Sequence, residues 1–223
     1  MPRTWSDNDP KAALMTRKRA AIVEAALRAF LETGYAESSV NRIAAAAGVS
    51  IKTLYRHFES KVDLFSAVML AACLGSPPNT QSGKAPEPCA PDNPPWFAEP
   101  PDRAFPLMGE LYLNHILSDD QVALYRVVLS DALRFPELSR HYHEVVIGKH
   151  AEIFARYLDR WAPVMGWNIV DKPQAALVFT SLLKAGILDD VLTGYRKPDA
   201  AEITRRAQQT SLRLLNLLNA GQL

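Results

Sequence analysis

The sequence contains few cysteines and no long apolar run. Only two of its 223 residues are cysteine, and one of them, Cys89, lies in a proline-rich segment that we expect to be mobile, so no structural disulfide is expected. No stretch approaches the roughly 18 consecutive apolar residues that cross a bilayer, and the start of the chain lacks the apolar core of a signal peptide. These absences argue against a membrane protein and against a disulfide-rich secreted domain. We therefore expect a cytoplasmic protein.

The motifs of common enzymes are also missing. Neither Gly-x-Ser-x-Gly nor His-Glu-x-x-His occurs, and Ser181 and Lys184 have the Ser-x-x-Lys spacing without the companion Lys-Thr-Gly and Ser-Asp-Asn elements. His141 and His143 are two positions apart and would face different sides of a helix, which disfavours a paired metal site. We expect neither an enzyme nor a bound metal or other cofactor.

The sequence does contain enough apolar residues for a core, and its charge is unevenly distributed. Apolar residues make up 48% of the chain and charged residues 22%, which favours a globular protein. The net charge is only +1, but residues 1–61 carry ten basic and six acidic side chains, a net charge of +4. The remaining residues carry 15 basic and 18 acidic side chains, a net charge of −3. We therefore expect a basic amino-terminal module on a mildly acidic body.

Apolar residues recur at helical spacing along most of the chain, and no convincing strand pattern remains, so the expected fold class is all-α. Thr16 and Ser50 are candidate N-caps, and Ser60 with Asp63 resembles a capping box. Ten of the sixteen prolines lie between residues 75 and 106, where no apolar period is present. Helices are predicted over residues 16–33, 40–47, 51–58, 61–74, 107–117, 119–134, 136–162, 173–193 and 199–219.

The second and third predicted helices form a helix-turn-helix. The left-handed backbone that is cheap for Gly48 permits a tight turn between them. Leu54 and Phe58 are four residues apart and should pack inward, while Lys52 and Arg56 lie on the opposite face. A helix that enters a major groove needs this arrangement, because the long donors reach base edges and phosphates while the apolar stripe fixes its orientation.

These residues carry a resemblance to a known family. The combination of Ile43-Ala44, Gly48-Val49-Ser50, Leu54-Tyr55, His57-Phe58 and Lys61 closely resembles the DNA-binding signature of TetR-family (tetracycline-repressor-like) transcriptional regulators. A weaker match, residues 124–128 followed by residues 134–138, resembles the carboxy-terminal domain of the AefR-like branch of that family. The resemblance implies a DNA-binding transcriptional regulator, most often a repressor.

The resemblance also implies roles for single residues. Ser39, Tyr55, His57 and Lys61 match positions that contact phosphates, and Lys61 lies at a helix start, where backbone amides attract anions. Base contacts are implied for Lys52 and Thr53, with Asn41 and Arg56 as further candidates. Ile51 replaces the polar residue of many relatives, and its role is open between core packing and contact with a thymine methyl group.

The resemblance further implies a homodimer that reads a palindromic operator, because a single three-helix head covers only a short half-site. The predicted helix 173–193 is apolar nearly all round, and the last helix also has a repeating apolar face. This pair resembles the two helices that form the dimer bundle in the family. The candidate dimer residues are Phe179, Leu183, Ile187, Ala207, Leu214 and Leu217.

A small-molecule effector is the last implied partner, bound in a cavity of the body. An apolar lining with a few polar tips suits an apolar or aromatic effector that releases the protein from DNA. The candidate lining residues are Tyr112, His115, Tyr125, Leu129, Phe154 and Phe179, with Trp161 as a further aromatic residue. In the proline-rich segment, Trp96 and Phe97 are candidates to dock on the body.

Five parts of the chain are therefore expected. Residues 1–15 form a mobile arm, 16–62 the helix-turn-helix domain, 63–74 a connecting helix, 75–106 a proline-rich loop and 107–223 a ligand-binding and dimerisation domain. Two alternatives stay open: a constitutive regulator without an effector, and a helical protein-interaction module whose DNA-binding head is degenerate. DNA binding that is selective for sequence and falls steeply with salt would exclude the second alternative.

Overall fold

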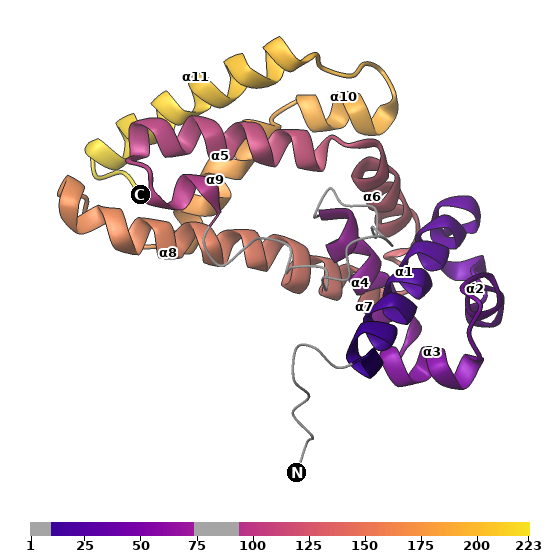
Figure 1. Ribbon diagram of the computed structural model, residues 1–223. Helices are drawn as coiled ribbons and strands as arrows, with labels where there is room; N and C mark the ends of the chain where they lie inside the picture. The colour runs from indigo at the N-terminus through magenta and orange to yellow at the C-terminus, as the bar shows by residue number, and fades with distance from the viewer. Residues whose placement is uncertain (1–9, 74–93) are drawn as a thin grey trace. The chain divides into compact units, whose positions relative to one another are not determined.

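The computed structural model describes residues 10–73 and 94–223, and every regular element within these ranges is helical (Figure 1). The expected all-α fold class is therefore confirmed. In chain order the elements are α1 (Pro10–Glu37), α2 (Val40–Ala46), α3 (Ile51–His57), α4 (Lys61–Cys73), the 3-10 turn η1 (Pro95–Ala98), α5 (Pro101–Ile116), α6 (Asp119–Asp131), α7 (Pro136–His141), the π-helical segment η2 (Tyr142–Ile147), α8 (Gly148–Met165), α9 (Lys172–Lys184), α10 (Ile187–Thr193) and α11 (Ala200–Asn219).

Two compact units make up the chain. The first unit comprises Met1–Cys89 and Ala123–Val145, and the second comprises Ala90–Val122 and Val146–Leu223. The structure therefore divides the predicted domain 107–223, because most of α6 and all of α7 belong with the amino-terminal helices. The physical reason is long-range packing that sequence periodicity does not report: α7 contacts α4 within the first unit.

Two helices begin earlier than predicted. α1 begins at Pro10, so Thr16 lies inside the helix and is not its N-cap, and part of the predicted mobile arm is helical. α5 begins at Pro101 instead of residue 107, because proline is tolerated in a first turn, where amide groups have no helical partner. Residues 101–106 were thus wrongly assigned to the proline-rich loop. Residues 94–100 of the predicted loop are described and contain η1, whereas residues 75–93 lie outside the described residues, as do residues 1–9 of the predicted arm.

The predicted helix 173–193 is interrupted. α9 ends at Lys184, Gly186 adopts a left-handed φ of 75°, and α10 begins at Ile187. Apolar residues continue through the break, which is why periodicity did not reveal it. The predicted helix 136–162 likewise comprises α7, η2 and α8, whose helical conformation continues to Met165.

The first unit is built on a small aromatic core. Phe30 and Phe65 meet edge to face with their ring centroids 5.0 Å apart, and Tyr35 lies 5.9 Å and 5.5 Å from these two rings. Ile22 and Leu64 are also fully buried. The apolar stripe of α1 therefore packs against α4, and it provides the base on which α2 and α3 rest.

The second unit has a larger aromatic core centred on Phe105 of α5. This ring lies 5.7 Å from Phe154, 5.7 Å from Tyr157, 6.3 Å from Trp167 and 5.8 Å from Phe179. Rings at these separations combine extensive apolar burial with favourable quadrupole contacts. α5, α8 and α9 are therefore joined through aromatic side chains.

The segment before α5 docks on this core. Trp96 is buried, and its ring lies 5.5 Å from that of Tyr157, whose hydroxyl donates to the Glu99 carbonyl at 2.9 Å. Phe97 packs against the same tyrosine at 5.9 Å. The expectation that Trp96 and Phe97 dock on the body is confirmed.

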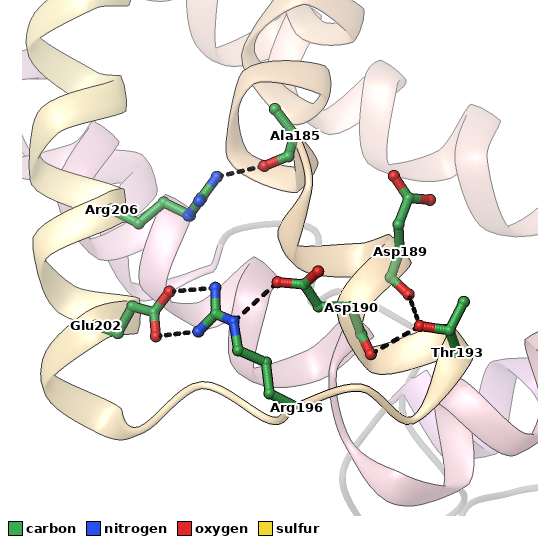
Figure 2. A network of polar contacts seen from close by, with 7 residues as sticks. All are labelled: Ala185, Asp189, Asp190, Thr193, Arg196, Glu202 and Arg206. Carbon is green, nitrogen blue, oxygen red and sulfur yellow. Dashed lines mark hydrogen bonds and ion pairs between the residues drawn. The ribbon is translucent and has the colours of Figure 1, made fainter.

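Ion pairs and caps fix the corner between α10 and α11 (Figure 2). Arg196 donates to Asp190 at 2.8 Å and forms a bidentate ion pair with Glu202, with hydrogen bonds of 2.7 Å and 3.0 Å. Arg206 of α11 donates to the Leu183 and Ala185 carbonyls at 3.3 Å and 2.8 Å. The free carbonyls at the end of α9 thus gain a donor from α11. No helix in the described part of the chain is long and apolar enough to cross a membrane.

Candidate nucleic-acid interface

The helix-turn-helix forms where the sequence predicted it. The Ser50 hydroxyl accepts from the Thr53 amide at 3.1 Å and so caps α3. Gly48 has a φ of 66°. A Cβ placed on Gly48 would meet no atom within 4 Å, so the left-handed backbone, and not a lack of space, requires glycine here. The predicted cap and turn are both confirmed.

The apolar faces of α2 and α3 are buried as expected. Ile43, Leu54 and Phe58 are each 1% exposed. Ile51 at the start of α3 is 38% exposed, which excludes core packing and leaves contact with an outside group as its role. Its side chain is instead available to an outside partner, such as a thymine methyl group in a major groove.

The predicted DNA-contacting residues gather on α2, on α3 and at the start of α4. Lys52, Tyr55 and Arg56 of α3 and Asn41 of α2 are exposed, whereas the other four are partly buried: Ser39, Thr53, His57 and Lys61. The exposed face of α3 thus carries two long cationic side chains and a phenol, opposite the buried Leu54. α1, α2 and α3 form what we call the reading head.

Of the two partly buried basic residues, Lys61 has its side chain held by the protein, whereas the buried Nε2 atom of His57 has no hydrogen-bond partner among the described residues. The Lys61 ammonium donates to the Ala36 carbonyl at 3.2 Å and lies 4.7 Å above the Tyr35 ring. Burial lowers the pKa of Lys61, while Asp131 and Glu37 oppose this shift. Burial, and then the charges of Arg56, Arg19 and Lys18, lower the pKa of His57, so this imidazole is mainly neutral at pH 7.

Arg19 has a positioning role that sequence reasoning did not find. Its guanidinium donates to the His57 carbonyl at 3.1 Å and lies 4.3 Å from the centre of the Phe58 ring. A cation at the carboxyl end of a helix complements the exposed carbonyl groups there. Arg19 therefore fixes the end of α3 from α1. The sequence shows a basic run at Arg17, Lys18 and Arg19 but not which of them makes this contact.

A capping box links α3 to α4. The Ser60 hydroxyl accepts from the Asp63 amide at 3.1 Å, and the Asp63 carboxylate accepts from the Glu59 amide at 3.0 Å. The box was predicted from sequence, although its carboxylate satisfies the amide of Glu59 rather than that of Ser60. The start of α4 is therefore fixed directly after the reading head.

The predicted effector-lining residues are not brought together within one unit. Tyr125 and Leu129 lie on α6 in the first unit, where Tyr125 stacks on Tyr142 at 5.2 Å and Leu129 is exposed. The other four lie in the second unit. Phe154 and Phe179 stack on each other at 5.6 Å and are almost fully buried in the core.

Tyr112 and His115 keep a more polar environment. His150 of α8 stacks on His115 at 5.9 Å and meets the edge of Tyr112 at 5.7 Å. The Nε2 atom of His115 is buried and has no hydrogen-bond partner among the described residues, as is true of the Trp161 indole nitrogen. Burial, and then His150, lower the pKa of His115 to about 4.

The predicted dimer residues require a correction. Five of the six are at most 1% exposed within a single chain, and only Leu217 is partly exposed: Phe179, Leu183, Ile187, Ala207 and Leu214 are core residues. An almost all-round apolar sequence on α9 and α10 reflects burial in their own unit. The large exposed apolar side chains of α9 and α11 are Leu177, 43% exposed, and Leu212, 62% exposed.

α3 has an outward basic face, and the capped helix α2 and the Gly48 turn hold it in place. This arrangement defines the class of helix-turn-helix DNA-binding proteins. Comparison with known families narrows this class. Residues 22–68 match the sequence model of the bacterial regulatory proteins of the tetR family. Residues 105–214 match the carboxy-terminal domain of AefR-like transcriptional repressors. The chain belongs to the TetR family, whose members are transcriptional regulators and not enzymes.

Individual relatives agree with this assignment. The HTH-type transcriptional repressor BepR of Brucella suis biovar 1 (strain 1330) is 43% identical over 51 residues, which cover 23% of this chain and 24% of that protein. The chain thus matches about a quarter of the length of this curated relative.

Solved structures extend the likeness to the whole fold. A TetR-family transcriptional regulator from Mesorhizobium loti MAFF303099 has a TM-score of 0.70 at 22% identity, covering 91% of this chain and 97% of that one. The flavonoid-responsive regulator FrrA has a TM-score of 0.68 at 26% identity, covering 90% and 96%.

Proposed function

We propose that this TetR-family regulator is a cytoplasmic repressor that binds a palindromic DNA operator as a homodimer and is released by a small apolar or aromatic effector. The observation that carries the proposal is the exposed face of α3. Lys52, Tyr55 and Arg56 are exposed there, while Leu54 on the opposite side is buried. This face offers cations and donors to a major groove and keeps the helix in a fixed orientation.

The proposal divides the interface into base contacts and phosphate contacts. Lys52 and Thr53 lie in the first turn of α3 and are assigned to bases, together with Asn41 and Arg56. Ser39, Tyr55, His57 and Lys61 are assigned to phosphates. Because His57 is mainly neutral, its phosphate contact is a hydrogen bond and not an ion pair.

Binding measured at several salt concentrations tests this division. Lys61→Ala should lower affinity for all duplexes and reduce the slope of log affinity against log salt by about 1, because one phosphate contact is lost. Lys52→Ala and Thr53→Ala should chiefly relax the choice of sequence. Equal losses at all three positions, independent of sequence, would contradict the division.

Dimerisation is proposed through the exposed sides of α9 and α11. These two helices pack together in the second unit, and each presents one large exposed leucine, Leu177 and Leu212. Pairing two copies through such faces would bury apolar surface that is otherwise exposed to solvent. Sedimentation of a Leu177→Glu, Leu212→Glu double variant tests this: a folded monomer is expected, and an unchanged dimer would refute these faces.

The effector proposal rests on the group formed by His115, His150 and Tyr112. The low pKa of His115 keeps its imidazole neutral at pH 7, so its Nε2, which has no hydrogen-bond partner in the described part of the chain, suits the hydroxyl group of an uncharged aromatic compound. FrrA is described as flavonoid-responsive, which makes flavonoids the first compounds to test. A saturating flavonoid should weaken operator binding by the wild type and less so by His115→Ala. Unchanged operator affinity would refute this mechanism for that compound.

A further inference from the structure

The junction between α1 and α2 is held by a side chain that is far away in the sequence. At Gly34 the backbone turns to φ 76°, ψ 176°, which ends the regular part of α1 and turns the next two amide groups in a common direction. One carboxylate oxygen of Asp131, at the end of α6, accepts from the Tyr35 amide at 2.9 Å and from the Ala36 amide at 3.1 Å. Two consecutive amides thus share one carboxylate oxygen, an arrangement typical of backbone anion sites.

Other contacts fix the same two residues. Lys61 donates to the Ala36 carbonyl, and Phe135, which follows α6, meets the Tyr35 ring edge to face at 5.1 Å. Tyr35 is only 4% exposed, and burial, followed by the charges of Glu137 and Asp131, raises its pKa to about 12. The Tyr35–Ala36 junction is therefore bound on its amide side by Asp131 and on its carbonyl side by Lys61.

This junction determines where α2 begins. The Ser38 hydroxyl donates to the Tyr35 carbonyl at 2.8 Å, and the next residue, Ser39, is the N-cap of α2 through the Arg42 amide. α2 then leads through the Gly48 turn into α3. A shift at Tyr35 would therefore be passed to the face of α3 that reads DNA, and small displacements of a recognition surface weaken binding strongly.

We propose that Asp131 is a positioning residue for DNA binding, so that the end of α6 holds the reading head in its binding geometry. This inference rests on the proposed function and deepens it. α6 begins in the second unit and ends in the first, so the chain passes between the units within this helix.

The sign of the effect separates positioning from simple electrostatics. Removing a negative charge near a DNA-binding surface should by itself tighten binding, because the protein then repels phosphates less. Loss of positioning should weaken binding to the operator more than binding to random duplex. Glu32 of α1 is exposed, so Glu32→Gln makes the same change of charge on the same unit without touching the junction.

The experiment compares the wild type with Asp131→Ala, Asp131→Asn and Glu32→Gln at a temperature where circular dichroism shows each to be folded. The first measurement is amide hydrogen exchange at Tyr35 and Ala36 in the free protein. The second is the affinity for an operator selected from a randomised duplex-DNA pool, compared with the affinity for random duplex. In Asp131→Ala the Tyr35 and Ala36 amides should exchange faster than in the wild type. Its operator affinity should fall by about tenfold, the size expected for a lost charge-assisted hydrogen bond. Asp131→Asn, which retains an acceptor, should lose less.

Two results would overturn the inference. One is unchanged exchange at both amides in Asp131→Ala. The other is operator binding by Asp131→Ala that is as tight as that of Glu32→Gln. If the wild type binds no DNA, the proposed function fails, and the exchange measurement still decides whether Asp131 holds the junction.

Discussion

The reading head and the second unit differ in how much of their structure is determined by residues close together in the sequence. In the head, the Ser50 cap, the Gly48 turn and the pair Leu54 and Phe58 act over a few residues. In the second unit, Phe105 meets rings that are 49 to 74 positions away, on α8 and α9 and at Trp167. Local rules therefore describe the head well, whereas the second unit depends on packing between distant helices.

The comparison also shows what apolar periodicity cannot tell. An apolar helix predicts burial, but not whether its own unit or a second chain covers it. Phe179 and Leu183 were assigned to a dimer interface, and both are at most 1% exposed within one chain. Leu177 lies between Ala176 and Val178 in the same apolar run and is nevertheless 43% exposed, so the apolar pattern does not separate it from the buried residues.

The largest expected effect on stability separates a buried from an exposed side chain of α9. Phe179→Ala should lower the free energy of unfolding by about 3–5 kcal/mol, because it leaves a cavity beside Phe105 and Phe154. Leu177→Ala, on the side of the same helix that is exposed in the single chain, should change it by less than about 0.5 kcal/mol at a protein concentration where the proposed dimer has dissociated. Urea unfolding of both variants measures the contrast. Similar values for the two would show that α9 is not packed as described.

The next effect concerns acid stability of the second unit. The pKa of His115 is about 4 in the folded chain against 6.5 for a free histidine, so the unfolded chain takes up the proton first as the pH falls. The stability that neutral His115 contributes is therefore fully present above about pH 6.5 and is lost as the pH falls toward 4. The loss in the free energy of unfolding is at most about 3 kcal/mol. His115→Gln should flatten the stability curve in this window, as measured by denaturant unfolding at several pH values. A curve with the wild-type slope would contradict the assignment.

A smaller effect tests the local character of the head. Ser50→Ala removes the cap of α3 and should lower the free energy of unfolding by about 1 kcal/mol. Ser50→Asp, which retains an acceptor, should preserve most of the stability, although its charge opposes DNA binding. Thermal unfolding followed by circular dichroism measures both. Equal losses in the two variants would show that the hydroxyl contact at the start of α3 does not stabilise the head.

The smallest effect separates two acidic residues beside the α1–α2 junction. Glu37 lies 3.9 Å from Arg134, and both side chains are largely exposed, so Glu37→Gln should change stability by less than about 0.5 kcal/mol. Asp131, with two amide donors, should matter far more. A destabilisation by Glu37→Gln as large as that by Asp131→Ala would erase this distinction.

Much of the fold was predictable, and the limits have physical causes. The helical class, the helix-turn-helix and the capping box at Ser60 followed from local patterns. The break at Gly186 did not, because apolar residues continue on both sides of it. The assignment of most of α6 and all of α7 to the first unit depends on packing against helices that lie far away in the sequence.

Within the candidate site, the sequence indicated which residues face outward but not what holds them. The exposure of Lys52, Tyr55 and Arg56 agrees with the prediction. The contact of Arg19 with the His57 carbonyl spans 38 positions, and that of Asp131 with Tyr35 spans 96. Neither partner could be chosen from spacing, because many charged residues lie at comparable distances along the chain.

Selection from a randomised duplex-DNA pool tests directly whether this protein reads a palindromic operator. The purified protein would be incubated with the pool at near-physiological salt, and the retained duplexes would be sequenced. We expect an enriched palindrome with half-sites about one helical turn apart or slightly more. No enrichment by a folded, dimeric protein would contradict this expectation and would favour a helical interaction module whose DNA-binding head is degenerate.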